Sequence, residues 1–209
     1  MSERPFIIVG GGGHARVVVS TLRRLGKSIL GFTDPDKEAT LGDDIEHLGR
    51  DEIITEKDPS AVVLTMGMGS VRDTGHRASL FAEQVQYGFR FPPLIHPDAV
   101  LASEAMIEAG AQVMAGSVIQ PGALLGENVI VNTNASVDHD CQIGAHSHVA
   151  PGATLSGEVV LEPQVHVGTG ASIIQGVKIG KNSVVGAGAV VIKDVPPETV
   201  VVGVPAHPK

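Results

Sequence analysis

The sequence predicts a small α/β module followed by a parallel β-helix, and three observations support this fold class. First, an apolar run near the start leads into four consecutive glycines and then into a helical pattern, as in a strand, turn and helix. Second, every sixth residue from Ile95 to Val191 is Ile, Leu or Val, at 17 positions without interruption. Third, the position two residues before each of these holds only Ala, Ser, Cys or Val from Ala105 to Ala189. A period of six fits neither a helix nor a simple strand, and it is typical of hexapeptide parallel β-helices.

The first elements expected are those of a βαβ unit. Phe6 to Val9 is a short apolar run, and the helical pattern after the glycines continues until Gly26, the residue type that often follows a helix. A second apolar run covers Ile29 to Phe32. Because the crossover of a βαβ unit favours a parallel pair, these two strands are expected in one parallel sheet.

The glycine-rich turn of this unit is a candidate phosphate-binding loop. Gly10, Gly12 and Ala15 match the spacing of the dinucleotide-binding fingerprint, and Asp34 follows about where an acidic residue would contact a ribose hydroxyl. Glycines allow the backbone to approach phosphate oxygens, and the N-terminus of a helix favours negative charge. The alternative is a tight turn that binds no ligand. The position between a strand and a helix favours the binding loop.

A second strand-to-helix junction is expected further along the chain. Ala61 to Met66 is the third strand candidate, and it is followed by Gly67, Gly69 and a helical pattern over residues 71–87. In an open α/β sheet, ligands bind where the strands end. Arg72 could contact a phosphate there or lie in solvent. Roughly 90 residues are too few for a six-stranded dinucleotide fold, so the module is expected to be a half-Rossmann unit.

The β-helix is expected to begin at a proline-rich hinge and to end in a capping tail. The hinge divides the chain into two domains, residues 1–93 and residues 94–209. Three hexads complete one triangular coil, so residues 18 apart should stack. The segment after Pro196 is expected to cover the open end, since terminal repeats need a cap. The chain is expected to turn at the glycines that directly follow a periodic aliphatic residue, namely Gly126, Gly144, Gly168, Gly180 and Gly186.

The composition argues against several classes of function. A net charge of −8 disfavours nonspecific binding to nucleic acid or to anionic membranes. No hydrophobic segment reaches the roughly 18 residues that span a bilayer, and the apolar start is too short for a signal peptide, so a cytoplasmic protein is expected. The single cysteine, Cys141, excludes an intrachain disulfide, and its place in the column of small residues predicts a buried apolar role.

Histidines are concentrated in the β-helix, where His139 is the candidate general base. It lies between two aspartates, and a carboxylate beside an imidazole can fix its tautomer, raise its basicity and stabilise its cation. His148 and His166 are 18 residues apart and should stack on the outside of the helix. For His146 and His166, a solvated face is the expected environment. A zinc site with three histidine ligands is the alternative.

Three segments of the chain resemble the hexapeptide-repeat sugar acyltransferases of the sialic-acid O-acetyltransferase and PglD type. They are IIVGGGGHARVVV near the start, FPPLIHPDAV at the hinge and NTNASVDHDCQIGAHSHVAPGATLSG in the β-helix. The resemblance covers nearly the whole chain. It implies a left-handed β-helix, a homotrimer, acetyl-CoA bound between adjacent helices, and a nucleotide-linked sugar bound on the N-terminal module. It implies no metal.

The same resemblance implies roles for particular residues. His139 matches the general base, Asp140 its acidic partner, and Gly157 a glycine whose backbone N–H faces the acetyl carbonyl. Coenzyme contacts are implied for His148, near the thioester, and for Thr169 and Ala187. Contacts with the sugar nucleotide are implied for His14, Asp34 and Asp36 of the module, and the glycine-rich turns add Gly10, Gly12, Gly13 and Gly67 as candidate substrate-binding residues.

The residues and the resemblance together predict an enzyme that moves acetyl from acetyl-CoA to the amine of a nucleotide-linked amino sugar. The expected acceptor is a 4-amino-4,6-dideoxyhexose. The amine is expected to attack the thioester directly, because the chain has a single cysteine and no signature of a serine nucleophile. The alternatives are O-acetylation of sialic acid or another sugar, a zinc-dependent hydratase on the same helix, and a non-catalytic trimeric scaffold that binds nucleotides.

Overall fold

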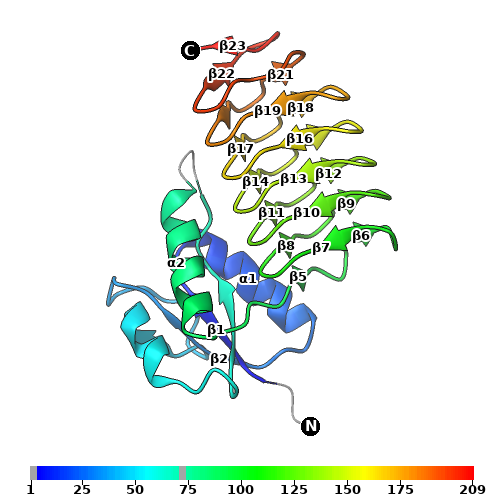
Figure 1. The fold of residues 1–209 in the computed structure, drawn as a ribbon. Helices are drawn as coiled ribbons and strands as arrows, with labels where there is room; N and C mark the ends of the chain where they lie inside the picture. The colour runs from blue at the N-terminus through cyan, green and yellow to red at the C-terminus, as the bar shows by residue number, and fades with distance from the viewer. Residues whose placement is uncertain (1–3, 71–73) are drawn as a thin grey trace.

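The computed structural model describes residues 4–70 and 74–209. It consists of an α/β module and a long β-helix, and the module lies beside the first coils of that helix (Figure 1). In the module, a four-stranded parallel sheet has the order β3-β2-β1-β4. Its elements are β1 Phe6–Val9, α1 Gly13–Arg24, β2 Ile29–Thr33, β3 His47–Gly49, the 3₁₀ helix η1 Asp51–Glu56, β4 Val63–Met66 and α2 Gly75–Gln86. The predicted βαβ unit and its parallel strands are confirmed.

The module differs from the sequence prediction in two places. The short strand β3 was not predicted, because its three residues are only half-buried and carry no hydrophobic pattern. The second helix begins at Gly75, later than the pattern over residues 71–87 predicts. Arg72, the candidate phosphate contact, lies outside the described residues.

Two hydrophobic clusters fill the module, one on each face of its sheet. α1 buries Val18 and Leu22 against one face, and Phe81 of α2 packs on the other. Leu94 and Met114, which belong to the β-helix, are fully buried members of the α1 cluster. The module and the first coils therefore share a core.

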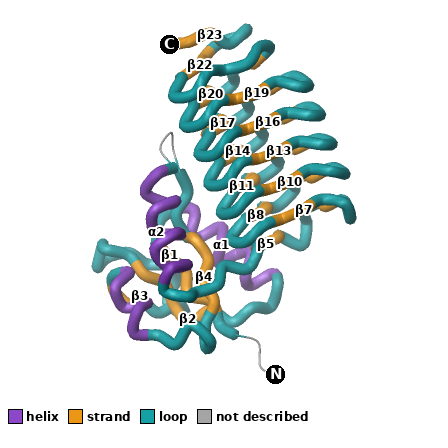
Figure 2. The backbone as a smooth tube through the Cα atoms, viewed as in Figure 1, coloured by secondary structure: helices purple, strands orange, loops and turns teal. Residues whose placement is uncertain are grey.

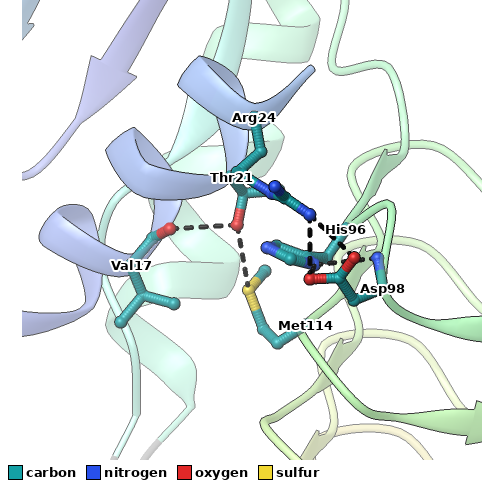
Figure 3. A network of polar contacts seen from close by, with 6 residues as sticks. All are labelled: Val17, Thr21, Arg24, His96, Asp98 and Met114. Atoms are coloured by element: carbon teal, nitrogen blue, oxygen red, sulfur yellow. Dashed lines mark hydrogen bonds and ion pairs between the residues drawn. The ribbon is translucent and has the colours of Figure 1, made fainter.

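Polar contacts at the edge of this junction are shown in Figure 3. Arg24 of α1 donates to both carboxylate oxygens of Asp98, at 2.8 and 3.0 Å. Thr21 donates to the carbonyl oxygen of Val17 at 3.0 Å and approaches the sulfur of Met114 at 4.0 Å. An exposed ion pair such as Arg24–Asp98 contributes little stability, so the buried apolar residues hold the module in place.

From Leu94 onward, short strands alternate with turns (Figure 2), and these strands of two or three residues form three sheets. The eight-stranded face contains β5 Leu94–Ile95, β8 Gln112–Val113, β11 Ile130–Val131, β14 His148–Val149, β17 His166–Val167, β20 Val184–Val185, β22 Val200–Val202 and β23 His207–Pro208. The six-stranded face contains β6 Val100–Leu101, β9 Val118–Ile119, β12 Ser136–Val137, β15 Thr154–Leu155, β18 Ser172–Ile173 and β21 Val190–Val191. The five-stranded face contains β7 Met106–Ile107, β10 Leu124–Leu125, β13 Gln142–Ile143, β16 Val160–Leu161 and β19 Lys178–Ile179.

The interior of the β-helix confirms the predicted register. Val137 pairs with Leu155 and His148 with His166, so residues 18 apart stack. The periodic aliphatic residues and the small residues two positions before them are both buried along the length of the core. Cys141 is fully buried there, as predicted, and burial raises the pKa of its thiol to about 11.

The glycines predicted to form the turns have a different role. Left-handed backbone occurs at every sixth residue from Gly110 to Gly188, three positions after each periodic aliphatic, whereas the predicted turn glycines do not adopt it. A Cβ on Gly144 would lie 2.6 Å from the backbone of the next coil, and one on Gly168 would lie 2.6 Å from the Ala187 nitrogen. The prediction was wrong because these glycines allow close approach between coils rather than positive φ.

The tail covers the upper end of the eight-stranded face. β22 continues this face in parallel with β20, and β23 folds back antiparallel to β22. Val201 of β22 is buried in the core of the helix, so the tail closes the stack as predicted. Within the described ranges, no helix is long and apolar enough to cross a membrane.

Candidate active site

A cavity of about 810 Å³ lies between the module and the upper part of the eight-stranded face. The module contributes the start of α1 and the loop after β4, and the β-helix contributes β14, β17, β20 and the turns that follow them. Five predicted site residues line this cavity, namely Gly13, His14, His148, Thr169 and Ala187. The structure therefore brings three of the four residues expected to contact the coenzyme, and two of those expected to contact the sugar nucleotide, to one place.

His14 lies in the first turn of α1 and is fixed by Gln112 of the β-helix. The Gln112 amide nitrogen donates to the carbonyl oxygen of Met66 at 2.7 Å and to the Thr65 hydroxyl at 3.1 Å. Its oxygen therefore faces His14, whose Nε2–H donates to it at 2.7 Å. Burial lowers the pKa of His14, which favours the neutral imidazole. Sequence patterns did not identify Gln112.

His148 is buried and lines the cavity, and both of its ring nitrogens are hydrogen-bonded. Nδ1 donates to the carbonyl oxygen of Ser70 at 2.9 Å and also lies 3.0 Å from the Ser70 hydroxyl. Nε2 then accepts from the side-chain amide of Asn132 at 3.2 Å. Burial, assisted by His166 and Arg77, lowers the pKa of His148 to about 3. The imidazole is therefore neutral, and its tautomer is set by Ser70.

The expected solvated environment is wrong for His166 and holds only in part for His146. His166 is 8% exposed, because it faces the cavity beside the module, and it stacks edge-on against His148 with ring centroids 5.2 Å apart. His146 is half-buried and accepts a hydrogen bond from Asn128 at 3.1 Å. The hexad pattern correctly placed both side chains on the outside, but it could not show what covers that surface.

Arg77 is a buried cation that the sequence patterns did not identify. It extends from α2 and donates to the Asn128 side chain at 2.9 Å, to the His146 carbonyl oxygen at 2.7 Å and to the carbonyl oxygens of Asn128 and Ser147. No carboxylate in the described part of the chain pairs with it. Burial lowers its pKa to about 10, so it remains charged at neutral pH.

The charge of Arg77 acts on the histidines around it. It lowers the pKa of His14, His146, His148 and His166, in each case after the larger effect of burial. A cation close to these imidazoles disfavours their protonation. The cavity is therefore lined by neutral imidazoles, which suits hydrogen bonding to substrates rather than charge pairing.

His139 and Asp140 lie on a different corner, between the six-stranded and five-stranded faces. The His139 Nδ1–H donates to the Asp140 carboxylate at 3.0 Å, which leaves the lone pair of Nε2 free to accept a proton. Asp140 adopts left-handed backbone with φ 58°, and its side chain lies over Gly122 of the coil below. The hydrogen bond to Asp140 raises the pKa of His139, with further contributions from nearby carboxylates.

Gly157 lies directly above His139 in the same column, as the predicted register requires. A Cβ at this position would lie 2.5 Å from Nε2 and Cε1 of the imidazole, so only glycine leaves room for the ring in this orientation. Among the described residues, no acceptor pairs with the Gly157 N–H. The corner therefore presents a basic nitrogen and an available backbone donor side by side.

Within one chain, the corner that carries His139 and Gly157 lies away from the cavity. Thr169 and Ala187 stack at the corner between the eight-stranded and six-stranded faces, and the six-stranded face separates them from His139. The predicted base and Gly157 thus lie at one edge of this face, and the predicted coenzyme contacts Thr169 and Ala187 lie at the other.

Asp34 lies at the end of β2 and supports the glycine turn. One carboxylate oxygen accepts from the Gly11 N–H at 2.7 Å, and the other accepts from the Asp36 N–H at 2.9 Å. A Cβ on Gly11 would lie 2.6 Å from the ring of Phe32, so this position also needs glycine. Asp34 thus has a structural role in the turn, and Asp36 is exposed beside it.

The predicted site glycines Gly67, Gly12 and Gly13 have two different kinds of surroundings. Gly67 packs so closely that a Cβ would collide with the Gly10 carbonyl oxygen, which explains its place after β4. Around Gly12 and Gly13, at the start of α1, no heavy atom of residues 4–70 or 74–209 lies within 4 Å of a Cβ position. The backbone at the N-terminus of α1 is therefore open to a ligand.

A metal centre was the alternative use of the histidines. Over residues 4–70 and 74–209, no group of three or more His, Cys, Asp or Glu side chains is arranged to hold a metal ion. The histidines described above instead have protein partners or face the cavity.

Both parts of the chain are similar to known proteins. Residues 5–77 match the PglD N-terminal domain, and residues 122–157 and 158–193 match the bacterial transferase hexapeptide (six repeats). These matches agree with the predicted half-Rossmann module and left-handed β-helix.

Three solved structures cover essentially the whole chain. The acetyltransferase domain of PglB from Neisseria gonorrhoeae, in complex with acetyl coenzyme A, is 35% identical, with 100% of each chain covered and a TM-score of 0.93. PerB from Caulobacter crescentus, in complex with CoA and GDP-perosamine, is 34% identical, with 100% of this chain and 98% of that chain covered and a TM-score of 0.90. WeeI from Acinetobacter baumannii is 25% identical, with 99% and 100% covered and a TM-score of 0.88.

Proposed function

The chain belongs to the hexapeptide-repeat sugar acetyltransferases with a PglD-type N-terminal domain, and we propose that it acetylates the amine of a nucleotide-linked amino sugar with acetyl-CoA. The observation that carries this conclusion is the full-length similarity to acetyltransferases seen with acetyl-CoA and with a nucleotide-linked amino sugar. A 4-amino-4,6-dideoxyhexose is the proposed acceptor sugar. The cytoplasmic location expected from the sequence is part of the same proposal.

The two domains divide the binding of the substrates in this proposal. Residues 1–93 hold the nucleotide sugar, and residues 94–209 hold acetyl-CoA. The open backbone at Gly12 and Gly13 and the neighbouring His14 support the first role. Thr169 and Ala187, which line the same cavity as His148, support the second.

His139 is the proposed general base. The amine nitrogen attacks the thioester carbon, a C–N bond forms, and the tetrahedral intermediate releases coenzyme A thiolate as the C–S bond breaks. The nitrogen loses a proton, which Nε2 of His139 accepts while Asp140 stabilises the resulting imidazolium. The free Nε2 and the 3.0 Å hydrogen bond at Nδ1 support this assignment.

Gly157 is the proposed oxyanion donor. Its N–H has no acceptor in the described part of the protein, and it lies next to the imidazole of His139. A backbone donor aimed at the developing negative charge typically contributes a few kcal/mol to catalysis. Binding of the two substrates close together supplies the other large contribution to the reaction rate.

A homotrimer is proposed to complete the site. His139, Asp140 and Gly157 lie at one corner of the β-helix, and the cavity with Thr169 lies at another. If neighbouring copies meet along their β-helices, the base of one copy can face the cavity of the next. Chromatographic mass measurement in solution tests the oligomeric state directly.

The proposed function predicts a specific pattern of binding and turnover. In a thermal-shift panel of UDP-, GDP-, dTDP- and CMP-linked amino sugars, the correct nucleotide should raise the unfolding midpoint, because a ligand adds RT ln(1 + [L]/Kd) to stability. Free thiol should then form from acetyl-CoA with that amino sugar but not with the analogue whose amine is a hydroxyl. Thiol release with sialic acid alone would support the O-acetyltransferase alternative instead.

The pH dependence of turnover should change when Asp140 is replaced. His139 accepts a proton only when neutral, so kcat falls as the pH drops through its pKa, which Asp140 raises. Asp140→Asn removes the largest cause of that shift, so the acidic limb of the pH profile should move to lower pH, while maximal kcat falls because the tautomer is no longer fixed. Asp44→Asn, at an exposed site paired with Arg23, is the control. An unmoved acidic limb in the Asp140 variant would contradict the pairing.

A further inference from the structure

His166 is the one buried imidazole of the cavity to which neither the sequence nor the family resemblance gives a role. It is 8% exposed and lines the cavity beside His148, Thr169 and Ala187. Its neighbour one coil below, His148, has a protein partner at each ring nitrogen. His148 therefore cannot offer a ring nitrogen to a substrate without breaking its bond to Ser70 or to Asn132.

The two ring nitrogens of His166 are in different surroundings. Nδ1 is enclosed and has no hydrogen-bonding partner among the residues that the structure describes. Nε2 is not among the enclosed atoms, and no described residue hydrogen-bonds to it. A polar side chain buried in this way usually has a partner, and here none is supplied by the described residues around the ring.

The tautomer of His166 follows from this difference. A neutral imidazole carries one N–H and one bare acceptor nitrogen. Enclosed N–H groups without a partner are rarer in proteins than enclosed acceptors without one, so the proton belongs on Nε2. Burial and the charge of Arg77 lower the pKa of His166, which keeps the ring in this neutral form. His166 therefore presents one N–H donor to the cavity.

We propose that the Nε2–H of His166 donates a hydrogen bond to an oxygen atom of a substrate bound in this cavity. The proposal rests on the proposed function, which supplies two sources of such an oxygen. One is a carbonyl of the coenzyme's pantetheine arm, and the other is a hydroxyl or phosphate oxygen of the nucleotide sugar. His166 is then a binding residue, whereas His148, one coil below, is hydrogen-bonded to Ser70 and Asn132.

Two conservative variants separate this hydrogen bond from simple packing. In His166→Gln, the side-chain amide nitrogen can reach the place of Nε2, whereas in His166→Asn it reaches only as far as Nδ1. Both side chains are polar, uncharged and no larger than His, so both should fold. His166→Phe, which keeps a ring but has no donor, is the third variant. Unfolding midpoints and chromatographic mass establish that each variant retains its structure.

Binding is measured by titration calorimetry with coenzyme A alone and with the nucleotide sugar alone, followed by kcat. His166→Asn and His166→Phe should weaken one of the two ligands by roughly 3- to 10-fold, the range expected for one neutral hydrogen bond, and His166→Gln should stay within about twofold of the natural protein. A change confined to coenzyme A identifies a pantetheine oxygen. A change confined to the nucleotide sugar identifies an oxygen of that substrate.

Two results would overturn the proposal. In one, neither dissociation constant changes in the Asn and Phe variants. In the other, the Gln variant loses as much affinity as the Asn variant, which would point to packing. The unsubstituted protein provides the separate check on function, because thiol release from acetyl-CoA with the amino sugar tests the proposed reaction whatever the behaviour of His166.

Discussion

Replacement of His139 by alanine should lower kcat by roughly 10² to 10⁴, the usual contribution of a general base. The dissociation constants of both substrates should change little, because the cavity residues that would bind them remain in place. Since the imidazole is half-exposed at a corner of the β-helix, its loss should not unfold the protein. Steady-state thiol release, with chromatographic mass as the check on assembly, measures the effect. Turnover within a few fold of the natural enzyme would show that another group accepts the proton.

Gly157→Ala tests the role of His139 by displacing its imidazole. The added methyl would lie 2.5 Å from Nε2 of His139, so the imidazole must move while its chemistry is unchanged. Misplacement of a reacting group by about 1 Å can cost about 100-fold, and kcat should fall by about that factor. Gln175→Ala, one coil above in the same column, alters an exposed side chain and is the matched control. Equal kcat in the Gly157 and Gln175 variants would contradict the stacking of base and donor.

Arg77→Met should give the largest loss of stability. The substitution keeps an unbranched apolar stem but leaves the carbonyl oxygens of Asn128 and His146 and the side-chain oxygen of Asn128 without their donor in a buried junction. Buried acceptors left unpaired cost about 1–3 kcal/mol each, so the free energy of unfolding should fall by about 3 kcal/mol in total after partial relaxation. Urea unfolding followed by circular dichroism measures this change.

Arg90→Met is the control for Arg77. Arg90 is exposed and belongs to the same module, so its replacement should alter the free energy of unfolding by less than about 0.5 kcal/mol. If the two variants were equally stable, the hydrogen bonds of Arg77 would not be holding the module to the β-helix. A second readout is the nucleotide-sugar affinity, which should weaken in the Arg77 variant because the cavity lies along the same junction.

The β-helix could be predicted from the sequence because its register is a local property. Each coil repeats the same inward positions, so the pairing of Val137 with Leu155 follows from counting. The same counting placed Gly157 over His139. The first strand, turn and helix of the module were predictable for a related reason, since the glycine turn marks where the pattern changes from strand to helix.

Contacts between the module and the β-helix could not be predicted in this way. Gln112 fixes His14 across 98 positions of sequence, Ser70 fixes His148 across 78, and Arg77 reaches Asn128 across 51. No periodicity relates such pairs. The environment of His166 was mistaken for the same reason, because the repeat shows which side chains point outward but not which outward surface is covered.

The left-handed corner at every sixth residue restricts how the length of this protein can change during evolution. Deletion of a single residue inside a coil would shift every later aliphatic residue out of the interior and move the strained corner onto side chains that do not tolerate it. Insertion or loss of a whole coil preserves both patterns and changes only the height of the stack, by about 4.8 Å. A whole coil can therefore be inserted between Ala187 and the capping strand β22 without disturbing the substrate surfaces, whereas an insertion or deletion between Asn132 and Ala187 would alter the cavity wall.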